Sequence, residues 1–243
     1  MLAGEVAAIA PDKPLPGGLV EQVVAAVNRH IRANRLGPGD PLPGESAFAI
    51  QLGVSRAVAR EAFRSMAMLK LIDTANGRRP RVSAIDRSVL GMVLDHAVHT
   101  DQTSIQQIYD VRRTIELRTA ALAALRRSDA ESAGIMSLAA AMRADFADAP
   151  RVMEHDIAFH ETIATASRNP LFALIVGAFQ VITRQTWPIG WTSRATDALR
   201  IASVEGHEAI ARAIEAHDPR AAEAAMAEHF DASVMALLAA GIT

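Results

Sequence analysis

Four ionisable side chains on three helical segments are of the types that bind divalent metal ions. Asp156 and His160 lie one helical turn apart on an apolar face, and His207 and His229 each continue the apolar face of another segment. Buried polar groups need partners, and one divalent cation would satisfy the aspartate and all three histidines together. The alternative is that each histidine is a core residue hydrogen-bonded to a neighbour. That alternative would win for any single histidine, but it weakens for the set.

Arg112 is a fifth ionisable residue on or beside a buried stripe. Its plain partner is Glu116, four residues later on the same helix. Its functional partner would be the carboxylate of a small ligand, held by two parallel hydrogen bonds. Spacing alone leaves both partners open. Arg184 and Trp187, on a nearby helix, could line the same pocket or could equally be surface and packing residues.

A second group of residues suits nucleic acid. Residues 13–87 carry 12 Lys and Arg against 6 Asp and Glu, a net charge of +6, whereas residues 88–243 carry −6 and the whole chain −2. Arg side chains suit guanine edges and phosphates, and a serine at a helix N-terminus can hold a phosphate. The alternative is a solvated helix face. The residues expected to face DNA are Ser55, Arg56, Ala57 and Arg60, with Asn76, Gly77 and Arg78 at the tip of a hairpin.

The elements around these basic residues are predicted from spacing and turn residues. Helices are expected from residue 19 to just before Gly37, over about 46–52, and over about 55–69 with Ser55 as N-cap. Gly53 is a natural stop for the second helix. Strands at 71–74 and 81–83 would be joined by a turn at Asn76-Gly77. Three helices and a basic hairpin predict a winged helix-turn-helix, whose third helix enters the major groove.

The rest of the chain is predicted to be helical, because alanine is dense and no apolar/polar alternation appears after about residue 88. The fold class is therefore mainly α, with an N-terminal winged helix-turn-helix and a C-terminal antiparallel bundle of about six or seven helices. Helix breaks are expected near 100–103, 127–128, 148–150, 168–170, 187–191 and 218–219. The predicted domains are a disordered arm (1–17), the DNA-binding domain (18–84), a linker and first bundle helix (85–103), and an effector- and metal-binding domain (104–243).

The N-terminal motif resembles the winged-helix signature of GntR-family regulators, and the resemblance covers roughly residues 19–83. Ser46 departs from the family, which usually has a DNA-contacting arginine there, and Ala59 stands where a larger residue is usual. The operator sequence therefore does not carry over. The motif reads Gly37-Pro38-Gly39-Asp40-Pro41-Leu42-Pro43-Gly44-Glu45, then Leu52-Gly53-Val54-Ser55-Arg56-Ala57-Val58-Ala59-Arg60-Glu61-Ala62.

The C-terminal residues resemble the FCD effector domain of the FadR-like branch of the same family, over about residues 88–240. The resemblance implies that Asp156, His160, His207 and His229 are metal ligands and that Arg112 helps to bind an organic acid. Asn169-Pro170 belongs to the pattern but is equally a plain break between helices. The matching residues are Val111-Arg112, Ile115-Glu116, Asp156-Ile157-Ala158-Phe159-His160, Asn169-Pro170, His207, Ala213-Ile214, Met226 and His229.

Composition excludes several classes of protein. The chain has no cysteine, which excludes disulfides, iron–sulfur clusters and thiol catalysis. Apolar stretches such as residues 171–179 are too short to span a bilayer, and the N-terminus lacks the basic start of a signal peptide. We expect a cytoplasmic protein that makes no membrane contact.

The predicted function is a homodimeric transcription regulator and not an enzyme. It is expected to be a repressor that binds a double-stranded DNA operator and responds to a sugar acid, hydroxy acid or dicarboxylate at the metal. Zinc is the first choice of metal, with nickel, manganese or iron as alternatives. Other possibilities are a sensor of the metal itself, a purely structural DNA-binding protein, or a metal-dependent hydrolase. The hydrolase lacks a base, because Glu161 follows His160 directly and is turned away from its face.

Overall fold

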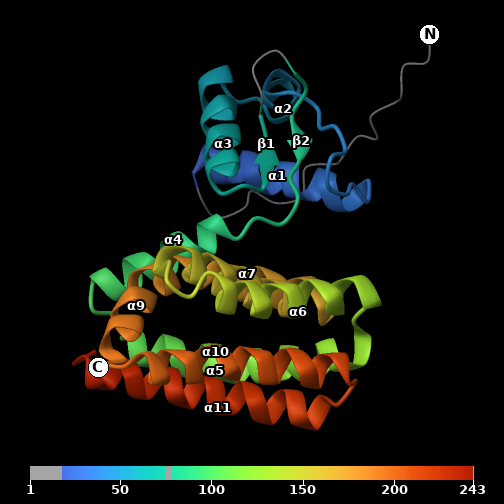
Figure 1. Ribbon diagram of the computed structural model, residues 1–243. Helices are drawn as coiled ribbons and strands as arrows, with labels where there is room; N and C mark the ends of the chain where they lie inside the picture. Colours follow the sequence, from blue (N-terminus) through green and yellow to red (C-terminus); the bar gives the residue numbers. More distant parts are fainter. Residues whose placement is uncertain (1–17, 75–77, 243) are drawn as a thin grey trace. The chain divides into compact units, whose positions relative to one another are not determined.

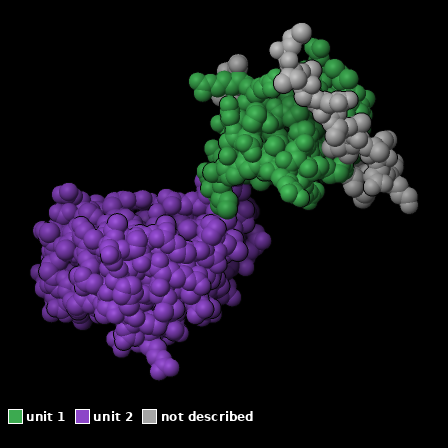
Figure 2. Space-filling view, turned by 90° about the vertical axis from the view of Figure 1, so that its right-hand side faces the viewer, with its two compact units in different colours: residues 1–86 green, residues 87–243 purple. Residues whose placement is uncertain are grey.

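The computed structural model describes residues 18–74 and 78–242. The chain divides into two compact units, unit 1 (residues 1–86) and unit 2 (residues 87–243), coloured separately in Figure 2. The prediction of a mainly helical protein is confirmed, with a small two-stranded sheet in unit 1. The predicted disordered arm (1–17) and the turn at Asn76-Gly77 lie outside the described residues.

The described part of unit 1 has three helices followed by a pair of antiparallel strands. These are α1 (Leu19–Ala33), α2 (Glu45–Leu52), α3 (Arg56–Met68), β1 (Ile72–Asp73) and β2 (Arg81–Val82). The strands pair antiparallel with Ile72 opposite Val82 and Asp73 opposite Arg81. Pro41 forms an isolated bridge with Arg81, so the proline-rich segment before α2 is attached to the hairpin.

The core of unit 1 forms where α1 packs on α2 and α3, and α3 contacts β1. Val23 and Val27 of α1 are fully buried, as their four-residue spacing predicts, and they share one apolar cluster with Phe48 and Phe63. This core fixes α3 while one face of that helix stays exposed.

Unit 2 is helical throughout its described part. Its helices are α4 (Ser88–His99), α5 (Ile105–Arg126), α6 (Asp129–Ala144), α7 (Ala149–Ala166), α8 (Pro170–Ala178), α9 (Gln180–Ser193), α10 (Asp197–Glu215) and α11 (Pro219–Ala239).

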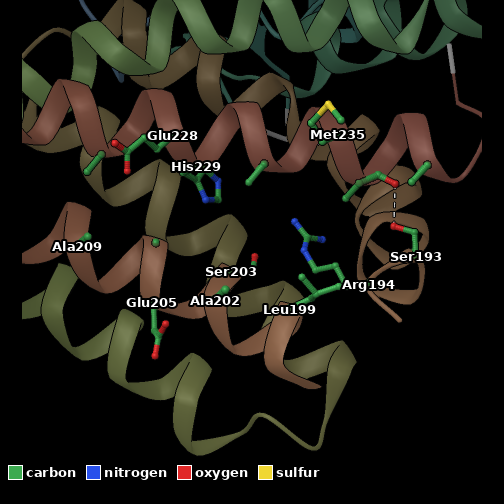
Figure 3. Close-up of a pocket in the computed structure, with 15 residues that line it drawn as sticks. Ser193, Arg194, Leu199, Ala202, Ser203, Glu205, Ala209, Glu228, His229 and Met235 are labelled. Carbon is green, nitrogen blue, oxygen red and sulfur yellow. Dashed lines mark hydrogen bonds between the residues drawn. The ribbon is translucent and has the colours of Figure 1, made fainter. Parts of the chain in front are cut away.

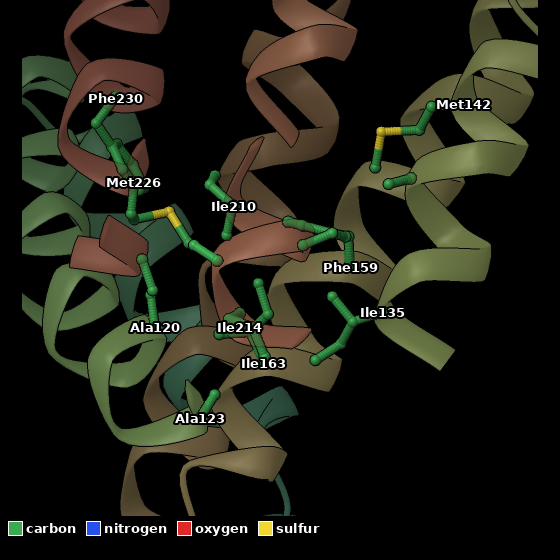
Figure 4. Packing of buried hydrophobic residues seen from close by; sticks show 14 of the residues in the cluster. Ala120, Ala123, Ile135, Met142, Phe159, Ile163, Ile210, Ile214, Met226 and Phe230 are labelled. Atoms are coloured by element: carbon green, nitrogen blue, oxygen red, sulfur yellow. The ribbon is translucent and has the colours of Figure 1, made fainter. Parts of the chain in front are cut away.

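The long helices of unit 2 form two layers, visible in Figure 1. Helices α6 and α7 pair in one layer, and α5, α10 and α11 form the other; α10 contacts α6, and α5 contacts α7. Figure 4 shows the apolar core between them, which includes Phe159 and Ile163 of α7, Ile210 and Ile214 of α10, and Met226 of α11. This core therefore fixes the positions of the helices that carry the predicted metal ligands.

Two details of the helix division differ from the prediction. The break expected at 187–191 is wrong, because α9 runs through Pro188 to Ser193. Trp187 stacks on Trp191 one turn later, with ring centroids 4.9 Å apart, and this packing across the proline favours a continuous helix. The break instead falls at residues 194–196, after α9, and the chain has an additional helix boundary at the buried Phe179, between α8 and α9. The described part of unit 2 therefore has eight helices rather than six or seven.

Within the described part of the chain, no helix combines the length and apolar character that crossing a membrane requires.

Candidate metal centre and nucleic-acid interface

The N-terminal end of α3 is exposed and capped as its sequence predicts. Gly53 ends α2 with φ 65°, a left-handed conformation that glycine adopts without strain. The Ser55 hydroxyl accepts a hydrogen bond from the Val58 backbone N–H at 3.2 Å, which satisfies one of the free donors of the first turn. Ser55, Arg56 and Ala57 are all exposed at this end. Their main-chain and side-chain donors are therefore accessible to a phosphate.

A basic hollow of about 780 Å³ lies between the start of α2, α3 and the hairpin. Arg60 lines it together with Arg64, Lys70 and Arg78, while Glu45 adds one negative charge. Ser46 also lines the hollow. The structure thus brings the predicted Arg60 and Arg78 to one surface, whereas Asn76 and Gly77 lie outside the described residues.

The four predicted metal ligands converge in unit 2. Asp156 and His160 come from α7, His207 from α10 and His229 from α11, and one ligand-type atom of each lies within 4.8 Å of the others. Asp156, His160 and His207 are buried. Zinc–nitrogen and zinc–oxygen distances of about 2.0–2.2 Å place the ligand atoms of a tetrahedral site about 3.3–3.6 Å apart. The cluster is therefore close to a size that encloses one divalent ion after small side-chain movements.

The nitrogens of two histidines show how well the cluster suits a cation. His207 has its Nδ1 2.9 Å from the Ser203 carbonyl oxygen and its Nε2 2.9 Å from Asp156 Oδ1. A neutral imidazole carries one N–H and can satisfy one of these acceptors only. A cation between Nε2 and Asp156, either a second proton or a metal ion, would satisfy the other. His160 Nε2 is buried and has no hydrogen-bond partner among the described residues, as a nitrogen reserved for a metal would.

The charges in the cluster shift its pKa values in different directions. Loss of hydration holds the pKa of His229 well below its usual value, and the nearby His207 and His160 lower it further. Burial acts to raise the pKa of Asp156, but the hydrogen bond and positive charge of His207 outweigh it and the pKa is lowered. Burial acts to lower the pKa of His160, but Glu116 outweighs it and raises that pKa. A neutral His229 and an ionised Asp156 are the forms that bind metals.

Glu116 links the cluster to Arg112. It is completely buried, with Oε1 3.0 Å from Arg112 Nε and Oε2 2.5 Å from His160 Nδ1. The second contact is a close approach that does not form a hydrogen bond, so Oε2 has no hydrogen-bond partner among the described residues. Arg112 also donates from Nη1 to the Thr183 hydroxyl at 2.9 Å. Arg112 is thus paired with Glu116, one of the two partners considered from the sequence. The contact between Glu116 and His160 was not predicted, because α5 and α7 meet only in the tertiary structure.

A small cavity of about 40 Å³ opens onto Asp156, His160 and His229. A water molecule needs about 10–15 Å³, so the space suits an ion and a small ligand group. Arg112 lines it, as does Trp187. Arg194 lines it as well; sequence reasoning missed this residue, because Pro188 predicted that the chain leaves the helix before it.

Arg184 is not brought to this cavity. It is an exposed residue of α9 whose guanidinium forms an ion pair with Glu154, and it does not line the site. Arg184 is therefore a surface residue, which is the alternative that the sequence left open. Glu161, considered as a possible base, turns away from the cluster and pairs with Arg87 at 2.9 Å.

Comparison with protein families identifies both units. The family model described as "FCD domain" matches residues 107–232, more than half of the chain. The model described as "Bacterial regulatory proteins, gntR family" matches residues 19–82.

Individual relatives and a solved structure agree with these matches. The HTH-type transcriptional regulator LutR of Bacillus subtilis is 29% identical over 203 residues, covering 82% of this chain and 92% of that protein. The galactonate operon transcriptional repressor of Escherichia coli is 28% identical over 211 residues, covering 84% and 90%. A solved GntR structure from Streptococcus agalactiae shares the fold, with a TM-score of 0.62, 24% identity, and coverage of 88% and 97%. Both sequence relatives are named as transcription regulators.

Proposed function

Because the chain belongs to the gntR family of bacterial regulatory proteins and carries an FCD domain, we propose that it is a homodimeric repressor whose operator binding is relieved by a small organic acid at a divalent metal ion. The family makes it a DNA-binding transcription regulator with an effector domain. The repressor sign, the metal and the acid are the proposal. The observation that carries it is the buried cluster of Asp156, His160, His207 and His229, whose ligand-type atoms lie within 4.8 Å of one another.

The donor set suits zinc, with nickel, manganese or iron as alternatives, since three imidazoles and one carboxylate accept each of them. When bound, the ion supplies a positive charge that attracts a carboxylate. The surrounding groups orient the ligands: the Ser203 carbonyl accepts a hydrogen bond from the Nδ1–H of His207, and Glu116 faces the Nδ1 of His160. In each case the Nε2 atom is left for the metal, which is the usual arrangement of outer-shell partners around metal-binding histidines.

Arg112 and Arg194 are the basic residues on the small cavity that could hold an acid. A guanidinium has five N–H donors, and Arg112 uses two of them for Glu116 and Thr183. One relative supports the repressor sign and a carboxylate as the group recognised at the metal, because it is named the galactonate operon transcriptional repressor. The effector must bind one conformation of the dimer more tightly than the other in order to change operator binding.

The metal site is tested by elemental analysis of purified protein and two histidine variants. His160→Ala together with His207→Ala is expected to remove stoichiometric metal. His155→Ala is the matched control, because His155 lies on the same helix but pairs with Asp145 at 2.8 Å, and it should keep the metal. Equal metal content in both variants would refute the site. Metal that switches DNA binding without any acid would identify a sensor of the ion itself.

Operator binding is tested by incubating the protein with fragments of its own genome and sequencing those it retains. Enriched sites that share an inverted repeat are expected, as a two-fold dimer requires. Arg60→Ala should weaken binding to these sites by about 10–100-fold, the range for one arginine that contacts a base. Arg32→Ala, which removes an exposed positive charge from α1, should leave sequence selectivity intact. Uniform retention that disappears with modest salt would mean phosphate attraction alone.

A further inference from the structure

A second and much larger cavity lies beside the metal cluster, between α10 and α11. It has a volume of about 620 Å³, within the range of about 300–1,000 Å³ that small-molecule sites span. Figure 3 shows Leu199 and Ala202 on one wall, with Met235 on the other. Six of its fifteen lining residues are alanine, from both helices, and Leu199, Met235 and Gly206 add three more without polar side-chain atoms. The other six are polar or charged. The alanine, leucine and methionine side chains form no hydrogen bonds, so this part of the lining suits an apolar group.

The two cavities share three lining residues. Arg194, Ser203 and His229 line both the 40 Å³ space at the cluster and the 620 Å³ groove. In Figure 3 the Arg194 guanidinium and the His229 ring point into the space between α10 and α11. A ligand whose carboxylate lies at the cluster therefore has its remaining atoms directed into the groove.

Charges along the groove limit what these remaining atoms can be. Glu205 and Glu228 line it on the side of His229 away from Arg194 (Figure 3). A second carboxylate on the ligand would enter a groove whose remaining charged residues are acidic, and like charges at short range repel. Hydroxyl groups would lose water wherever they meet the alanine, leucine and methionine side chains of the lining rather than its serines and glutamates.

We infer that the effector is a monocarboxylate with an apolar body, whose carboxylate lies near Arg194 and His229 and whose hydrocarbon part occupies the groove between α10 and α11. This inference rests on the proposed function, because it names the class of acid that the same site takes. It separates this chain from sensors of polyhydroxy acids and dicarboxylates. The hydrocarbon part meets Leu199, Ala232 and Met235.

The test is calorimetric titration of the zinc-loaded protein with acetate, butanoate and hexanoate. Affinity is expected to rise about fourfold for each methylene group that enters the groove, which corresponds to the usual transfer free energy of a buried CH₂. Hexanedioate and gluconate, which also have six carbons, should bind more weakly than hexanoate. Equal affinities for acetate and hexanoate, or a preference for gluconate, would overturn the inference.

Two tryptophan variants on α11 locate the binding. Ala232 is exposed and lines the groove, so Ala232→Trp should remove the gain from acetate to hexanoate while acetate affinity is kept. Ala224 is exposed on the same helix outside the groove, so Ala224→Trp should keep the gain. An unchanged gain in Ala232→Trp would overturn the inference.

The outcomes distinguish the inference from the proposed function. Acetate binding that needs zinc but shows no gain with chain length would overturn the inference alone. Failure of every acid to bind, or binding that ignores zinc removal, would overturn the proposed function. The mass of each variant is measured by light scattering. If Ala232→Trp alone changes the oligomeric state, the groove belongs to a contact with a second copy of the chain, and the inference is wrong.

Discussion

Replacing Glu116 tests whether the buried charges around the metal cluster act as one unit. Its carboxylate is fully buried between Arg112 and His160, at 3.0 and 2.5 Å. Burial acts to raise its pKa, but His160 and Arg112 outweigh it, so the pKa is lowered and the group is ionised. Removing it would leave a buried guanidinium, 5% exposed, with Thr183 as its remaining hydrogen-bond partner among the described residues.

The expected loss of stability in Glu116→Ala follows from this burial. Breaking one side of a buried ion pair costs about 3–5 kcal/mol, because the other charge stays buried and uncompensated. For a domain of about 150–250 residues, each kcal/mol shifts the melting temperature by about 2–4 °C. Glu116→Ala should therefore lower the melting temperature of unit 2 by about 6–20 °C. Glu116→Gln keeps the side-chain volume and one hydrogen-bond acceptor for Arg112, so its loss in free energy of unfolding should be smaller, at about 1.5–3 kcal/mol.

The assay is thermal unfolding with a chelator, followed by competitive titration of zinc. Glu116→Gln should also weaken zinc binding by about 10–100-fold, because His160 loses the carboxylate that orients its ring. Asp231→Asn is the control: it removes an ion pair with Arg113, but that pair is exposed, so stability and metal affinity should change little. A melting temperature in Glu116→Ala within about 2 °C of the parent, or normal zinc affinity in Glu116→Gln, would refute this reasoning.

Two further predictions concern unit 1 and are measured by urea unfolding together with operator binding. Phe63 is completely buried, so Phe63→Ala should destabilise unit 1 by about 3–5 kcal/mol and abolish DNA binding with it; a loss below about 1 kcal/mol would show that the site collapses around the smaller side chain. Gly53 has φ 65°, and a methyl group added at its Cα would meet open space. Gly53→Ala should therefore destabilise unit 1 by about 1–2 kcal/mol through backbone strain alone. An unchanged urea midpoint would mean that the turn rearranges at no cost.

Local chemistry made the DNA-binding unit predictable. Ser55 caps α3 and Gly53 ends α2 because each residue satisfies or relieves its own backbone, and neither effect needs distant contacts. The apolar spacing of Val23 and Val27 likewise identified the buried side of α1.

Contacts between distant segments set the limit of prediction. The sequence predicted that the four ligand-type residues lie together, because each is on the apolar face of its helix and these faces pack into the same core. The structure places them in one cluster. The meeting of Glu116 with His160 depends on how α5 packs on α7, which spacing within one helix does not contain. Arg194 was missed because Pro188 suggested a helix end, whereas the stacked Trp187 and Trp191 keep that segment helical.

The alanine walls of the groove between α10 and α11 have a consequence for how this regulator could change its ligand over evolution. Every alanine codon becomes a valine codon by one nucleotide substitution, and each such change adds bulk to a lining in which six of fifteen residues are alanine. One added methylene in an apolar pocket shifts discrimination by about 10–200-fold. With an acid bound in this groove as inferred above, single mutations would retune the length of the acid that is recognised, while the buried charged residues stay fixed.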